Sequence, residues 1–119
     1  MAESKRRTGK ASNYAYGRGK EKQVGKVIKA YEGGSYRRSA GSRGAADVVN
    51  HLPDGTVVMT QVKASRAYSR SMPSIDNNSK DRLAYSAMKY ANKSGRPVIA
   101  QVVMTKGNRI VSQETIANI

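Results

Sequence analysis

The feature that most constrains the fold is the segment Leu52-Pro53-Asp54-Gly55-Thr56, which separates two stretches with the composition of β-strands. These stretches are residues 46–51 (ADVVNH) and 56–63 (TVVMTQVK), the second rich in β-branched side chains. Pro, Asp and Gly in this order suit a three-residue hairpin loop, which is a type I turn followed by a left-handed glycine. The sequence therefore predicts an antiparallel hairpin closed by Leu52 and Thr56.

This register predicts a polar patch on the hairpin. It places Asp47 directly opposite Gln61, and Lys63 opposite Ala45. Gln61 and Lys63 are two residues apart on one strand, so they project from the same face. Carboxylate and amide oxygens suit a hard cation such as Mg²⁺. The alternative for Asp47 is an ordinary acid at a strand end, and a slip of one residue would destroy the patch.

A helix is predicted before the hairpin, over residues 18–32 (RGKEKQVGKVIKAYE), and Gly33 follows as at many helix C-termini. Glu21 lies at the edge of its apolar stripe, so its carboxylate is expected to face the sheet. The alternative is an acid in the first turn that the helix dipole favours. Gly25, inside the helix, indicates a close approach of another segment. The apolar stripe consists of Val24, Val27, Ile28 and Tyr31.

The remaining pattern predicts an α/β fold in which helices flank a central mixed β-sheet, in the order α-β-β-β-α-β-β. The apolar run 97–104 (PVIAQVVM) is expected to be a strand buried on both faces. The other expected elements are a strand at 35–40, a polar loop at 64–77, a helix capped by Asn78 or Ser79 and running to about Asn92, and a weaker strand at 109–112.

Composition limits the function classes. The 119 residues include 22 Lys and Arg against 8 Asp and Glu, a formal charge of +14, which indicates a polyanionic partner such as nucleic acid. The chain has no cysteine, which excludes thiolate chemistry, and the single histidine, His51, excludes a His-rich zinc site. Because no apolar run approaches the ~18 residues of a membrane span and the N-terminus lacks a signal-peptide pattern, we expect an intracellular protein, in the cytoplasm of a prokaryote or of the host cell of a virus.

The order of these motifs resembles a known family. Asp47 followed by Gln61-Val62-Lys63 resembles the PD-(D/E)xK nuclease signature in its QxK form, with Ala46 in place of the proline. The segments GRGKEKQVGKVIKAYEGG, SYRRSAGSRGAADVV and TVVMTQVK, within residues 17–66, look like the archaeal Holliday junction resolvases. The resemblance implies a restriction-endonuclease-like fold, here as one nuclease-like domain over residues 17–119 behind a flexible basic arm at residues 1–16.

The resemblance also implies a metal site and a reaction. Asp47, the Gln61 side chain and the Val62 carbonyl would hold Mg²⁺, or Mn²⁺ in its place, with Glu21 binding directly or through water. Lys63 would orient or deprotonate the water that attacks a phosphodiester. Gln61 stands where resolvases usually carry an acid, which removes one negative charge from the site.

The implied substrate is a four-way (Holliday) DNA junction, cut by a homodimer with two sites, and no membrane is involved. Ser42, in the glycine-flanked loop AGSRG, would contact the scissile region. Two alternatives are another PD-(D/E)xK DNA endonuclease, restriction-like or nicking, and a non-catalytic binder of structured nucleic acid. The expected DNA-binding residues are Lys5, Arg6, Arg7, Lys10, Arg18, Lys20, Arg38, Ser42, Arg43, Arg66 and Arg70.

Overall fold

The computed structural model describes residues 10–38, 46–68, 70 and 72–119, and it confirms the predicted order of elements. In this part of the chain no helix is long and apolar enough to cross a membrane. The elements are α2 (Lys10–Glu32), β1 (Ser35–Arg38), β2 (Val48–His51), β3 (Val57–Ser65), α3 (Asn77–Ser94), β4 (Val98–Lys106) and β5 (Arg109–Asn118).

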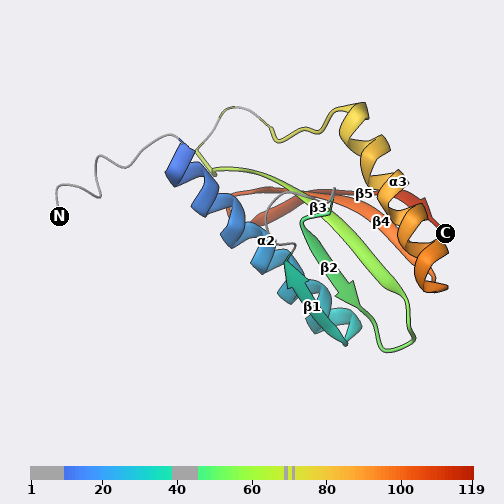
Figure 1. The fold of residues 1–119 in the computed structure, drawn as a ribbon. Helices are drawn as coiled ribbons and strands as arrows, with labels where there is room; N and C mark the ends of the chain where they lie inside the picture. Colours follow the sequence, from blue (N-terminus) through green and yellow to red (C-terminus); the bar gives the residue numbers. More distant parts are fainter. Residues whose placement is uncertain (1–9, 39–45, 69, 71) are drawn as a thin grey trace.

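The strands form one mixed five-stranded sheet in the order β1-β2-β3-β4-β5 (Figure 1). Neighbouring strands are antiparallel except β3 and β4, which are parallel and are joined through α3. A parallel pair needs such a crossover, because its connection must return the chain to the starting edge of the sheet. The expectation of a mixed sheet flanked by helices is confirmed.

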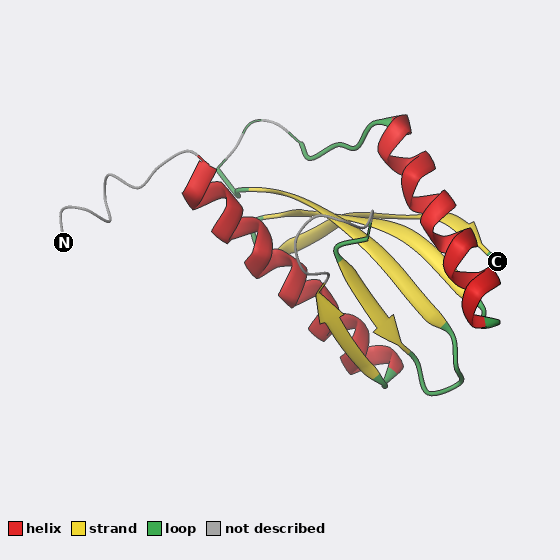
Figure 2. Cartoon of the chain, in the orientation of Figure 1, coloured by secondary structure: helices red, strands yellow, loops and turns green. Residues whose placement is uncertain are grey.

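The two helices cover opposite faces of the sheet, as the alternation of adjacent core residues shows (Figure 2). Val48 packs with Val24 of α2, whereas Val49, its neighbour in β2, packs with Leu83 of α3. The same alternation in β3 assigns Met59 to the α3 face and Val62 to the α2 face. Helix α2 lies over β1, β2 and β3, and α3 lies mainly over β4 and β5.

The predicted hairpin is confirmed. The Leu52 amide donates to the Thr56 carbonyl (2.9 Å), and the Gly55 amide donates back to the Leu52 carbonyl (3.1 Å). Gly55 has φ +94°, the left-handed conformation that the turn requires. The pairs from Val48 with Thr60 to His51 with Val57 follow the predicted register. His51 lies at the hairpin end of β2, at the opposite end of the strand from Asp47.

Three boundaries differ from the prediction. Helix α2 begins at Lys10, so residues 10–16, expected in the flexible arm, are helical, and residues 1–9 lie outside the described part. Helix α3 is capped by Asp76, whose carboxylate accepts from the Ser79 amide (2.8 Å), and not by Asn78 or Ser79. Strand β5 extends to Asn118, because pairing with β4 overrides its weak local pattern.

Candidate functional site

The predicted position of Asp47 requires a correction. The regular ladder between β2 and β3 ends at Val48, which pairs with Thr60, and the Asp47 amide also donates to the Thr60 carbonyl (2.8 Å). Two residues of one strand therefore face one residue of the other, as at a β-bulge, and Asp47 is not directly opposite Gln61. Bulges re-aim side chains. The Asp47 carboxylate accepts from the Val62 amide at 2.9 Å, and Ala45, expected opposite Lys63, lies outside the described residues.

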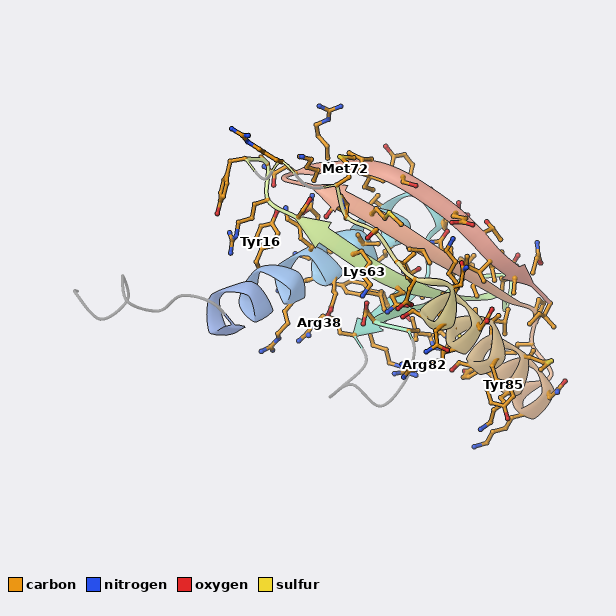
Figure 3. The ribbon with its side chains drawn as sticks, turned by 90° about the horizontal axis from the view of Figure 1, so that it is seen from above. Tyr16, Arg38, Lys63, Met72, Arg82 and Tyr85 are labelled. Carbon is orange, nitrogen blue, oxygen red and sulfur yellow. The ribbon has the colours of Figure 1, made fainter. Side chains whose placement is uncertain are left out.

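Gln61 and Lys63 share one face of β3, the face of Met59 and α3, as predicted. The Gln61 side-chain oxygen is buried and has no hydrogen-bond partner. A buried acceptor without a donor costs free energy, and among the described residues Asn50 and Thr105 also carry such a buried oxygen. In the view of Figure 3 Lys63 lies between Arg38, from β1, and Arg82, from α3.

Glu21 reaches the site from α2, and the expectation that it faces the sheet is confirmed. Its carboxylate lies 3.7 Å from the Arg38 guanidinium of β1, and only 22% of its side chain is exposed. Gly25, one turn further on, lets the helix approach closely, because a Cβ there would collide with the Tyr36 ring. The Gly25 carbonyl also accepts from the side-chain amide of the buried Asn50 (3.3 Å). These contacts hold Glu21 at the β1–β2 edge.

The two acids influence one another. Burial raises the pKa of Glu21 above its ordinary range, the nearby negative charge of Asp47 raises it further, and Arg38 opposes both effects. Burial also raises the pKa of Asp47, whereas the Val62 amide and the positive charge of Lys63 lower it. Asp47 therefore lies within electrostatic reach of both Glu21 and Lys63. The fold holds two partly buried carboxylates at an energetic cost that a divalent cation would offset.

The donor atoms around Asp47 suit such a cation. Within the described ranges no three His, Cys, Asp or Glu side chains gather into a metal-binding group. The set expected from the sequence has two carboxylates, Asp47 and Glu21, together with the side-chain oxygen of Gln61, which has no partner, and the Val62 carbonyl. All of these donors are oxygens, and Mg²⁺ is commonly held by one or two carboxylates together with water. The residues fit a hard cation.

The expected DNA contacts are placed unequally. Lys20 is only 8% exposed and donates to Gln23 (3.1 Å) and Asn108 (2.9 Å), so its ammonium is committed to the fold. Arg38 is bound to Glu21, whereas Arg18 and Arg70 lie at the surface. Ser42 and Arg43, like Lys5, Arg6 and Arg7, lie outside the described residues, and for Lys10 the structure describes the helical backbone alone.

A further group of residues lies where α2 meets the end of β3. Tyr16, in the segment expected to be a flexible arm, lies in α2 instead, and its hydroxyl donates to the Ser65 carbonyl at 3.0 Å. The Arg66 guanidinium lies over its ring, 4.2 Å from the centroid. Together with the exposed Tyr68 they line a pocket that also includes Val62. If the predicted helix had been extended upstream of residue 18, through Ala15 and Tyr16, it would have placed Tyr16 beside β3.

Comparison of the chain with protein-family models, with curated proteins and with solved structures found no match.

Proposed function

We propose that the protein is a Mg²⁺-dependent, structure-selective endonuclease that cuts four-way DNA junctions by phosphodiester hydrolysis, on a restriction-endonuclease-like fold. The main observation in favour is the pair of partly buried acids Asp47 and Glu21, which lie within electrostatic reach of one another, with Lys63 within reach of Asp47. Gln61, whose side-chain oxygen has no hydrogen-bond partner, lies two residues from Lys63 on the same face of β3. This is the set of groups that the resemblance to PD-(D/E)xK nucleases requires, and it occurs in the expected order of elements.

In this proposal each residue has one task. Asp47, Gln61, the Val62 carbonyl and Glu21 hold Mg²⁺, which supplies Lewis-acid activation of the phosphodiester and of the attacking water. The Val62 amide fixes the Asp47 carboxylate through the 2.9 Å hydrogen bond. Lys63 orients the water, or takes its proton, and offsets the negative charge that develops on the phosphate. Arg38 balances Glu21 until a phosphate arrives.

The proposed substrate follows from charge. The 119 residues carry a formal charge of +14, which favours contacts with phosphates, and phosphate contacts carry no sequence information. DNA shape then remains the basis of selection, which favours a branched substrate over a defined duplex sequence. Symmetric cutting of a junction requires two sites, so we propose that the active form is a homodimer.

The proposal is tested on a synthetic four-way junction with Mg²⁺ or with EDTA, and with linear duplex as competitor. We expect Asp47→Asn and Lys63→Ala to abolish cutting while the affinity for the junction stays within about twofold, since each removes one charge from a highly basic surface. Asp54→Asn is the matched control, because Asp54 is an exposed acid in the hairpin loop at the other end of β2.

The results also separate the alternatives. If the wild type binds junctions but never cuts them, the protein is a non-catalytic binder, and Asp47 and Glu21 are only ion-pairing groups. If linear duplex competes as well as the junction, a restriction-like or nicking nuclease is the better description. If Asp47→Asn cuts as fast as the wild type, the assignment of the site is wrong.

A further inference from the structure

A pocket of about 460 Å³ lies where α2 crosses the C-terminal end of β3. Its walls are Tyr16 and Gly17 of α2, residues 62–66, and Tyr68 from the following turn. Its volume is within the range of roughly 300–1,000 Å³ that small-molecule sites occupy. Val62 belongs both to the pocket and to the candidate site, since its amide binds the Asp47 carboxylate. The pocket therefore begins beside the proposed reaction centre.

The wall of the pocket is fixed by several contacts. The Ser65 carbonyl accepts from the Tyr16 hydroxyl (3.0 Å) and from the Gly107 amide (2.9 Å). Gly107 has φ +61°, and a Cβ on it would lie 2.8 Å from the Ala67 Cβ, so the turn between β4 and β5 packs tightly against the turn after β3. Lys20 adds a hydrogen bond from α2 to Asn108 of that same turn. Three elements thus hold the pocket in place.

The outer part of the pocket differs from this wall. Tyr68 is 82% exposed, although Ala67 beside it is packed against Gly107. Because the Tyr68 ring is exposed at the rim of the pocket, a flat ligand can stack on it without displacing a packed side chain. Arg66, over the Tyr16 ring, adds positive charge and a second flat group to the same pocket. Stacking surfaces with cationic neighbours are typical of sites for unpaired nucleobases.

We propose that this pocket binds one unstacked nucleobase of the DNA substrate, next to the phosphodiester that is cut, with Tyr68 as the stacking ring. The inference rests on the proposed function, and it adds a residue that selects branched DNA. At a branch point a base can leave the helical stack at small cost, whereas in continuous duplex the cost of unstacking opposes binding. The same chemistry would accept a base from a single strand, so the test includes both sources.

The experiment measures binding and not cleavage. A 2-aminopurine is placed at the branch point of a four-way junction, in a single-stranded oligonucleotide and in a linear duplex, and its fluorescence is followed on titration with protein in EDTA. We expect a change in fluorescence with the junction and the single strand but not with the duplex. Tyr68→Ala should remove that change and weaken junction binding about tenfold, within the range that loss of one base–aromatic stack produces.

Two variants serve as controls. Tyr68→Phe keeps the ring and should behave like the wild type, which distinguishes stacking from a hydrogen bond of the hydroxyl. Tyr31→Ala removes a tyrosine of matching exposure (85%) near the C-terminal end of α2 and should have no effect. An unchanged fluorescence response in Tyr68→Ala, or an equal response with duplex, overturns the pocket proposal. The two proposals can also fail separately. If Tyr68→Ala loses the fluorescence response but the wild type does not cut junctions in Mg²⁺, the base pocket is supported and the endonuclease proposal is wrong.

Discussion

Asp47 illustrates how single residues in this site are placed for something other than stability. It leaves the regular β-ladder at a bulge, and its carboxylate is partly buried between the Val62 amide and the charge of Glu21. Its pKa is raised mainly by burial, so the folded protein holds a proton on Asp47 more tightly than the unfolded chain does. An ionised Asp47 therefore opposes folding, and its hydrogen bond from Val62 and the charge of Lys63 reduce that cost.

This shift predicts a pH dependence of the metal-free protein. The stability from a protonated Asp47 is fully present below its ordinary pKa of 3.8 and is lost as pH rises through the raised pKa of the folded state. Asp47→Asn cannot ionise and keeps an oxygen to accept from Val62. We expect its melting temperature to exceed that of the wild type by a margin that grows as pH rises above 3.8 and becomes constant once pH has passed the raised pKa of Asp47 in the folded state. Calorimetry in EDTA measures this margin, and a margin independent of pH would contradict it.

Gln61 gives a second prediction at the scale of the residue. Gln61→Glu adds a third carboxylate where Asp47 and Glu21 already have raised pKa values. Like charges in a partly buried site oppose one another, so the metal-free variant should unfold at a lower temperature than the wild type. Mg²⁺ should stabilise the variant more than the wild type, and at lower concentration, because the added charge strengthens cation binding. Thermal unfolding across a Mg²⁺ titration checks both effects. If the variant and the wild type are stabilised half-maximally at the same Mg²⁺ concentration, Gln61 is not a metal ligand.

At the scale of the element, α2 positions Glu21 through close packing. The helix carries Glu21 on the turn before Gly25, and the Tyr36 ring of β1 occupies the space that a side chain at Gly25 would need. The helix therefore lies close to β1 and β2, and this closeness lets Glu21 reach Arg38 and approach Asp47. A small residue in the helix interior, although unfavourable by propensity, permits this close packing.

Two glycines of α2 provide a matched test of this packing. Gly19→Ala adds a methyl group with no atom within 4 Å and should stabilise the protein by about 0.5–1 kcal/mol. Gly25→Ala gains the same helix propensity but collides with Tyr36, which typically costs about 1–3 kcal/mol, so the net effect should be destabilising. Urea unfolding measures both changes. Equal stabilisation by the two substitutions would show that α2 does not need the close contact.

At the scale of the whole molecule, the formal charge of +14 would govern the proposed association with DNA. Each cation that neutralises a phosphate in duplex DNA steepens the dependence of log affinity on log salt by about 0.9. Such contacts position the DNA without reading its sequence. In the proposed function, the charge would therefore set the affinity for DNA and its salt dependence, whereas selection of branched DNA would depend on geometry.

One pair of arginines tests where this charge acts. Arg70 follows β3, whose C-terminal end carries Lys63, and its side chain is exposed. Arg96 is also exposed but lies beside Gly55, at the hairpin end of the sheet. Arg70→Ala should lower the salt slope of junction binding by about 0.9, and Arg96→Ala should leave it unchanged. Fluorescence anisotropy over a range of salt concentrations gives the slopes. Equal slopes for the two variants would contradict the proposal that DNA binds near the C-terminal end of β3.

The sequence by itself determined the elements and the hairpin register, because both follow from local physics. Turn chemistry at Pro53, Asp54 and Gly55 permits one loop, and that loop fixes the pairs from Val48 to His51. The alternation in β3 determined that Gln61 and Lys63 share a face, and Gly25 indicated a close packing partner without revealing that it is Tyr36. The boundary at Lys10 was missed, because residues 10–16 lack a continuous apolar stripe and Tyr16 is held by the distant Ser65.

Only the tertiary structure decided how the site is assembled. The bulge at Asp47 depends on which amides two strands offer to each other, and local pattern carries no record of it. The pairing of Glu21 with Arg38, the burial of Lys20 against Asn108 and the pocket beneath Tyr68 all join residues far apart in the chain. Whether a given charge is available to a ligand or committed to the fold depends on such long-range contacts, which form only when the helices pack on the sheet.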